Sequence, residues 1–144
     1  MGYKRKAHIV FLSESASLAA MAEGFANSIG AEWMEARAAA LSPATLDALT
    51  VQVMAEAGIE IAQKQFQLPI EPLLQWADLL VTLDAESEGH CPPLPPGVQK
   101  RHYPFPVLEA DDDLTGCRVL RDKVKARVEG MVGGMKLLEK AARE

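Results

Sequence analysis

The strongest constraint on the fold is a pair of short, nearly continuous apolar runs that lie far apart in the sequence, at residues 7–12 and 78–83. Runs of this kind are typical of strands that are buried on both faces of a parallel sheet. A hydroxyl-rich loop follows the first run, and Leu18, Met21 and Phe25 then recur at helical spacing until Gly30 supplies a stop signal. The order strand, polar loop, amphipathic helix predicts the opening of a βαβ unit.

The rest of the chain continues this alternation. Strands are predicted at residues 32–36 and 98–103, an extended segment at 59–61, and a loop at 63–67. A helix is predicted over the apolar stripe of Leu46, Leu49, Val53 and Ala57, which Gly58 ends, and a short one at residues 72–76. A final helix is predicted just after Asp111-Asp112-Asp113, with its apolar stripe running from Leu120 to Leu138. We therefore predict an α/β fold, a three-layer αβα sandwich around a four-stranded parallel sheet, in a single domain covering residues 1–144. In such folds the ligand crevice lies outside the carboxyl ends of the strands.

The composition and charge narrow the range of possible functions. The net charge is -5 with 24% charged residues, which does not favour binding to nucleic acid or to an anionic membrane. No apolar run approaches the roughly 20 residues that cross a bilayer, and the N-terminus does not resemble a signal peptide, so we expect a cytoplasmic protein. Cys91 and Cys117 are expected to be reduced thiols. No cofactor is expected, and no metal site either, because His90 and His102 have no recognised ligand spacing.

Several stretches together carry a family resemblance. They are residues 9–11, 21–25, 49–61 and 77–83, the Cys91-Pro92 pair, residues 94–97 and 102–104, and residues 118–127. In this order they resemble the low-molecular-weight protein tyrosine phosphatases and thioredoxin-coupled arsenate reductases, with 91–104 closest to the reductase branch. The resemblance implies the phosphotyrosine phosphatase-like, flavodoxin-like fold. It also implies a cysteine nucleophile after the first strand, an arginine that clamps the oxyanion, and an aspartate that protonates the leaving group.

This chain departs from the family at each of those positions. A gapless alignment on Met21-Ala22-Glu23 puts Leu12 at the nucleophile and Leu18 at the arginine. Ala19 stands where a serine steadies the thiolate, and Val107 stands at the general acid. Even one neutral oxyanion donor contributes about 2.7–4 kcal/mol to transition-state stabilisation, so losing the charged clamp should abolish activity at the family's rates. The resemblance therefore predicts a catalytically inactive homologue.

Two residual sites stay open as alternatives. Ser13 would reach the nucleophile position if the alignment were one residue out, and Ser13, Ser15 and Ser17 could still form a weak anion loop. Cys91 falls at the second of the two further cysteines of the reductase relay, whereas Asp84 replaces the first, so an intramolecular relay is incomplete. The alternative function is thus a residual phosphatase or arsenate reductase working through Ser13 or Cys91.

A binding or regulatory protein is the main functional hypothesis. The former active-site face, which we define as Leu12, Ala16, Leu18, Ala19 and Val107, is apolar where the family meets a charged oxyanion. Exposed apolar patches usually mark interfaces. We therefore expect a protein partner, or self-association, through this face. The alternative is that the pocket collapses onto Leu12 and Leu18; Leu12, at the end of a buried strand, is expected to point into the core in either case.

Overall fold

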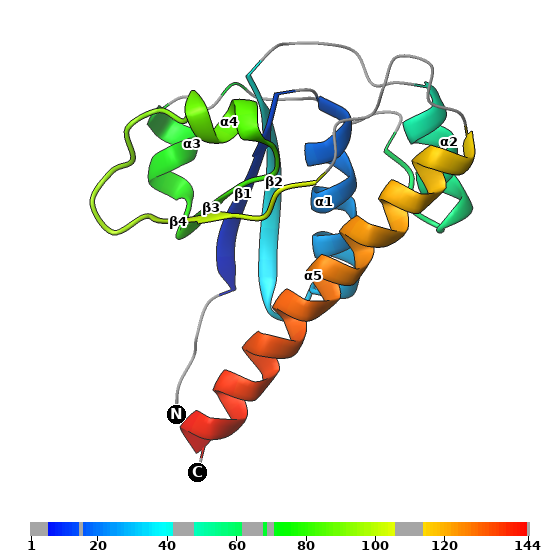
Figure 1. The fold of residues 1–144 in the computed structure, drawn as a ribbon. Helices are drawn as coiled ribbons and strands as arrows, with labels where there is room; N and C mark the ends of the chain where they lie inside the picture. Colours follow the sequence, from blue (N-terminus) through cyan, green and yellow to red (C-terminus); the bar gives the residue numbers. More distant parts are fainter. Residues whose placement is uncertain are drawn as a thin grey trace.

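The structure is a computed structural model that describes residues 6–14, 16–41, 48–61, 68, 71–105 and 114–143, with side chains described as far as residue 137. Ser15, Val107 and the loop predicted at 63–67 lie outside the described residues. In chain order the elements are β1 (Ala7–Ser13), α1 (Ala16–Ile29), β2 (Met34–Ala40), α2 (Ala48–Glu56), α3 (Glu71–Trp76), β3 (Leu79–Thr82), α4 (Ala85–Gly89), β4 (Gln99–His102) and α5 (Leu114–Arg143) (Figure 1).

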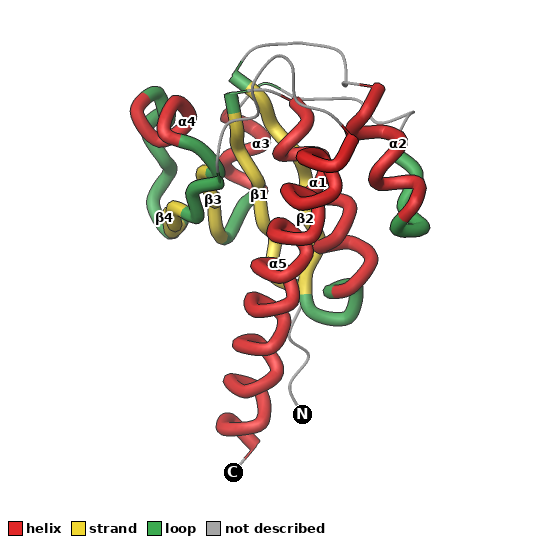
Figure 2. Tube along the Cα trace, turned by 45° about the vertical axis from the view of Figure 1, so that its right-hand side comes forward, coloured by secondary structure: helices red, strands yellow, loops and turns green. Residues whose placement is uncertain are grey.

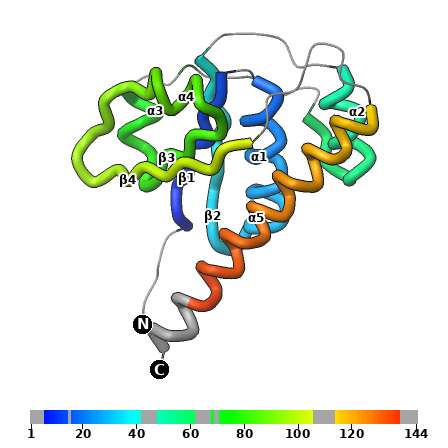
Figure 3. Tube along the Cα trace, in the orientation of Figure 1, coloured from blue at the N-terminus to red at the C-terminus, as the bar shows by residue number. Residues whose placement is uncertain are grey.

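The four strands form one parallel sheet in the order β2-β1-β3-β4, which confirms the predicted fold class. Helices α1, α2 and α5 lie on one side of the sheet, and α3 and α4 lie on the other (Figure 1). Figure 2 shows α1 and α5 side by side in front of the central strands. Figure 3 shows α5 extending past the end of the sheet. No helix in the described ranges has both the length and the apolar content needed to cross a membrane.

Strand β1 separates two hydrophobic cores. Ile9 and Phe11 pack with α1, α2 and α5 in the larger core, whereas Val10 and Leu12 pack with Leu73 and other residues of α3 in the smaller one. All four of these β1 side chains are at most 1% exposed. The prediction of a strand buried on both faces is therefore confirmed for residues 9–12, whereas Ala7 and His8 at the start of the strand are half-buried.

Glycines end the first two helices as the sequence predicts. Gly30 follows the last residue of α1, and its N–H donates to the carbonyl of Ala26 at 2.9 Å. Gly58 follows α2 with a φ of 83°, in the left-handed region that favours glycine. Residues 59–61 were predicted to be extended, and they are not part of any strand. The N–H of Ile59 donates to the carbonyl of Met54 in α2.

Strand β2 begins and ends later than predicted, at Met34 and Ala40. It lies at the edge of the sheet, so one of its sides has no neighbouring strand. Two polar side chains of α1 bond to that strand. The N–H of Ala38 donates to Glu23 Oε2 at 2.7 Å, the N–H of Ala36 donates to Asn27 Oδ1 at 2.8 Å, and Asn27 Nδ2 donates to the Ala36 carbonyl at 3.0 Å. These bonds satisfy edge groups that an isolated strand would leave unpaired.

We expect Asn27→Ala to lower the free energy of unfolding by about 1–3 kcal/mol, because both backbone groups of Ala36 lose their partner in a partly buried position. Ser28→Ala is the matched control on the neighbouring exposed position and should change stability by less than about 0.5 kcal/mol. Urea unfolding measures both. Equal values for the two variants would mean that water replaces the Asn27 amide at no cost.

Candidate functional site

The predicted site lies at the carboxyl edge of the sheet, where β1, β3 and β4 end beside one another. Leu12 of β1 is paired in register with Thr82 of β3, and Thr82 is paired with His102 of β4. The N–H of Leu83 continues the ladder by donating to the Leu12 carbonyl at 2.9 Å. The loop after β1 and helix α4 therefore meet at one edge, as parallel topology requires.

The apolar residues of the former active-site face do not form a surface. Leu12 is 0% exposed and packs in the smaller core, while Leu18 at 7% and Ala19 at 0% pack in the larger one. Ala16 is also buried, at 1%. Leu12 lies in the core, as its place at the end of a buried strand predicts. The expectation that Ala16, Leu18 and Ala19 line an exposed patch is wrong, because the two cores on either side of β1 extend up to this edge and enclose them. Val107 lies outside the described residues.

The serines of the possible anion loop differ in their surroundings. Ser13 is the last residue of β1 and is 0% exposed, and its Oγ accepts the N–H of Ala19 in the first turns of α1 at 3.1 Å. The first backbone N–H groups of a helix have no intrahelical partner, and Ser13 Oγ serves as the acceptor for one of them. Ser17 is half-buried, and Ser15 lies outside the described residues.

Asp84 has a structural role at this edge that the sequence analysis did not predict. Its carboxylate is 7% exposed and accepts two backbone N–H groups, that of Ser87 at 2.8 Å and that of Glu14 at 2.9 Å. Asp84 is also the N-cap of α4, and the Ser87 side chain completes a capping box. The signal was present as Asp84 and Ser87 three positions apart directly after a strand, although α4 itself is short and was not predicted. An internal carboxylate thus satisfies an amide of the loop after β1.

The surroundings of Asp84 are acidic. Glu14 is exposed on the loop, and Glu86 and Glu88 are exposed on α4. The chain has no lysine or arginine between Lys6 and Arg37, nor between residue 77 and Lys100. An oxyanion that approached this edge would meet carboxylates rather than a cationic clamp.

The two histidines near the edge bond to separate partners. His102 Nδ1 lies 2.7 Å from Thr82 Oγ1 and 3.5 Å from Glu88 Oε2. His90 Nδ1 lies 3.1 Å from the carbonyl oxygen of Glu86, one turn earlier. Within the part of the chain that the structure describes, no three His, Cys, Asp or Glu side chains converge as metal ligands.

Cys91 is half-buried in the proline-rich segment after α4 and packs against the smaller core. Its thiol donates to the Pro92 carbonyl at 3.5 Å. Burial raises the pKa of Cys91, and the nearby charge of Lys100 offsets this only in part. The reactive form of a cysteine is the thiolate, so this environment lowers its reactivity. Cys117 is buried within the larger core at 1% exposure.

Comparison with known proteins agrees with the resemblance read from the sequence. No protein-family model matches the chain. Arsenate reductase 2 of Staphylococcus haemolyticus is 31% identical over 115 residues, which cover 76% of this chain and 82% of that protein.

Two solved structures share the fold. An arsenate reductase in the phosphate binding state superimposes with a TM-score of 0.69 at 22% identity, covering 90% of this chain and 98% of that one. A YwlE mutant from Bacillus subtilis superimposes with a TM-score of 0.74 at 17% identity, covering 91% of this chain and 99% of that one. The sequence match to the staphylococcal protein, over most of both chains, shows that this chain belongs to the arsenate reductase family.

Proposed function

We propose that this chain is a catalytically inactive member of its family that acts as a binding or regulatory protein. The observation that carries the proposal is the loop after β1, which has neither a cysteine nor an arginine. Leu12 and Leu18 stand at the positions where the resemblance expects these two residues. Both leucines are buried in the chain's own cores. No reactive side chain therefore stands at either position in place of the thiolate or the guanidinium.

The electrostatics of the edge support the same proposal. Phosphoryl or arsenate chemistry requires positive groups aimed at the oxyanion in the transition state. Here the Asp84 carboxylate accepts the N–H of Glu14, and the Glu14 side chain adds a second negative charge to the same loop. An incoming dianion would have to compete with Asp84 for a backbone donor and overcome repulsion from both carboxylates.

The residual-enzyme alternative depends on Ser13 or Cys91. A serine nucleophile needs a base within hydrogen-bond reach, whereas Ser13 Oγ accepts a backbone N–H and is 0% exposed. Cys91 is the more accessible of the two, but its raised pKa disfavours the thiolate at neutral pH. These observations favour the inactive form over either alternative.

A partner that binds at this edge would have a polar contact surface, not the apolar one that the sequence suggested. Leu12, Ala16, Leu18 and Ala19 are internal, so a protein partner or a second copy of the chain at this edge would contact polar groups instead. The exposed carboxylates of Glu14, Glu86 and Glu88 are the groups that this edge offers. A partner with a basic surface fits them by charge complementarity.

The purified protein should not hydrolyse p-nitrophenyl phosphate above the buffer rate, and it should not reduce arsenate when thioredoxin or glutathione is supplied. The physical reason is the missing nucleophile, clamp and general acid. Release of p-nitrophenolate and of arsenite measures the two reactions. Cys91→Ala and Ser13→Ala serve as controls: activity that either variant removes would establish the residual-enzyme alternative. Activity that survives both would mean that another group carries the chemistry.

Millimolar phosphate or sulfate should leave the melting temperature of the wild type unchanged. A ligand that binds only the folded state would stabilise it by about 2.7 kcal/mol at 100 times its dissociation constant, which a thermal scan detects readily. Chloride at matched ionic strength is the control for salt effects. A saturating rise with phosphate that disappears in Ser17→Asp would contradict the proposal, because it would show that the loop amides still bind an oxyanion.

Cys91 should react with iodoacetamide more slowly than free cysteine at pH 8, because burial raises its pKa and lowers the thiolate fraction. The rate should keep rising at pH values where free cysteine has levelled off. The raised folded-state pKa also means that its contribution to stability is present below the pKa of the unfolded thiol and is lost as the pH rises through the folded pKa. Cys117→Ser removes the second thiol from the mass-spectrometric assay. A rate above that of free cysteine would restore Cys91 as a redox candidate.

A further inference from the structure

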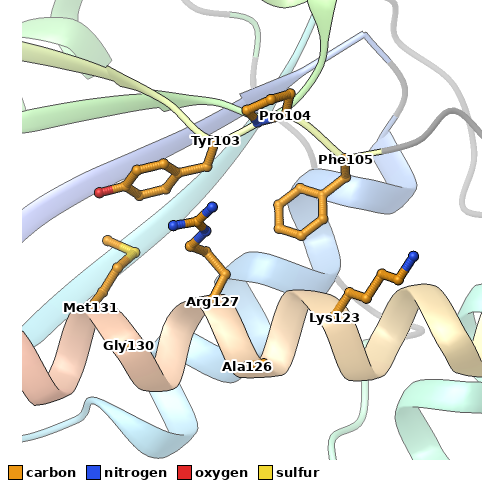
Figure 4. Close-up of a pocket in the computed structure, with 8 residues that line it drawn as sticks. All are labelled: Tyr103, Pro104, Phe105, Lys123, Ala126, Arg127, Gly130 and Met131. Atoms are coloured by element: carbon orange, nitrogen blue, oxygen red, sulfur yellow. The ribbon is translucent and has the colours of Figure 1, made fainter.

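A groove lies between α5 and the segment that follows β4, and its volume is about 620 Å³. Figure 4 shows Tyr103, Pro104 and Phe105 along one wall, with α5 forming the other. The residues that α5 contributes are Lys123, Ala126, Arg127, Gly130 and Met131. Pockets of about 300–1,000 Å³ are typical of small-molecule sites. None of the groove residues belongs to the former active-site face.

The course of α5 leaves this groove open. The helix packs against α1 and α2, whose side chains meet Leu120, Val124 and Val128 in the larger core. The neighbouring face of α5 points toward the segment after β4, and Gly130 contributes no side chain there. A Cβ at Gly130 would meet nothing within 4 Å, so close packing does not require glycine at this helical position. Glycine is among the least helix-favouring residues, and its effect here is to keep the groove hollow.

Two cations lie one helical turn apart in the groove. The Arg127 guanidinium lies over the Tyr103 ring at 4.4 Å from its centroid. Lys123 lies at the other side of the Phe105 ring, so that the ring is flanked by both positive groups (Figure 4). Like charges at i and i+4 on a helix repel each other, and among the described residues neither has a carboxylate within ion-pair distance.

We propose that the groove is a binding site for a small planar aromatic anion, a ring system that carries a carboxylate, sulfonate or phosphate group. The flat part would stack on Phe105 and on the Arg127 guanidinium, which already lies over an aromatic ring. The negative group would pair with one of the two cations, either the Arg127 guanidinium or Lys123 on the other side of the Phe105 ring. Half-buried Met131 closes the apolar end beside Tyr103. One ligand class thus matches both the aromatic residues and the cations of the groove.

The test titrates 2-naphthoate into the full-length protein labelled with ¹⁵N and follows the amide shifts. Two probes separate the contributions: 2-naphthalenemethanol has the ring without the charge, and acetate has the charge without the ring. We expect 2-naphthoate to bind at least about fivefold more tightly than the neutral alcohol, and acetate not to saturate. The shifted amides should lie in residues 103–105 and 123–131.

Matched variants on α5 test the location. Gly130→Leu fills the groove, whereas Gly134→Leu makes the same change at an exposed position on the same helix that also has nothing within 4 Å of a Cβ. Both should raise the melting temperature, because leucine favours the helix, but only Gly130→Leu should weaken 2-naphthoate binding, by at least about fivefold. Lys123→Gln should likewise weaken binding, whereas Lys125→Gln, an exposed lysine outside the groove, should not.

Three outcomes would overturn the proposal. They are equal affinity for 2-naphthoate and the neutral alcohol, equal effects of the two glycine variants, and amide shifts confined to the loop after β1. The last outcome would also contradict the absence of an anion site in the proposed function. The first two leave that proposal unaffected, so the two can fail separately.

Discussion

The burial of β1 on both faces is the constraint on which the rest of the structure depends. Because Ile9 and Phe11 belong to one core and Val10 and Leu12 to the other, the strand can neither slip in register nor tilt without exposing one set. Its neighbours β2 and β3 are paired to it along the same residues. The end of β1 therefore fixes where α1 begins and where the loop after β3 must lie, whatever residues stand at that edge.

A loop that binds an oxyanion leaves its backbone N–H groups for the ligand. Without a ligand those donors still need acceptors, because a buried N–H without a partner is costly. In this chain Ser13 Oγ takes the N–H of Ala19, and the Asp84 carboxylate takes that of Glu14. Leu12 and Leu18 fill the space on either side with apolar contacts. At this edge these backbone N–H groups therefore have acceptors within the chain, and the apolar side chains are buried in its own cores rather than exposed to a partner.

The sequence predicted those features that depend on local pattern. The buried strands, the glycines that end α1 and α2, and the short helix α3 each follow from periodicity or from a turn residue. Features that depend on distant partners were missed. Strand β2 is rich in alanine, and two side chains of α1 bond to its backbone. Leu18 was expected at the surface because of its family position, although its helical spacing with Met21 and Phe25 indicated the buried side of α1. Asp84 was interpreted by its family position rather than as a cap.

Natural sequences tend to break local rules where function demands it and to obey them elsewhere. At the carboxyl edge of the sheet the rules are obeyed: α4 is capped by Asp84, and the apolar residues Leu12 and Leu18 are buried. Along α5 they are broken, because a glycine without a packing requirement lies inside the helix at Gly130 and two like charges stand one turn apart. Both departures face the same groove, beside two half-buried aromatic rings. The proposed ligand would remove part of the charge conflict on this face of α5 by pairing with one of the two cations.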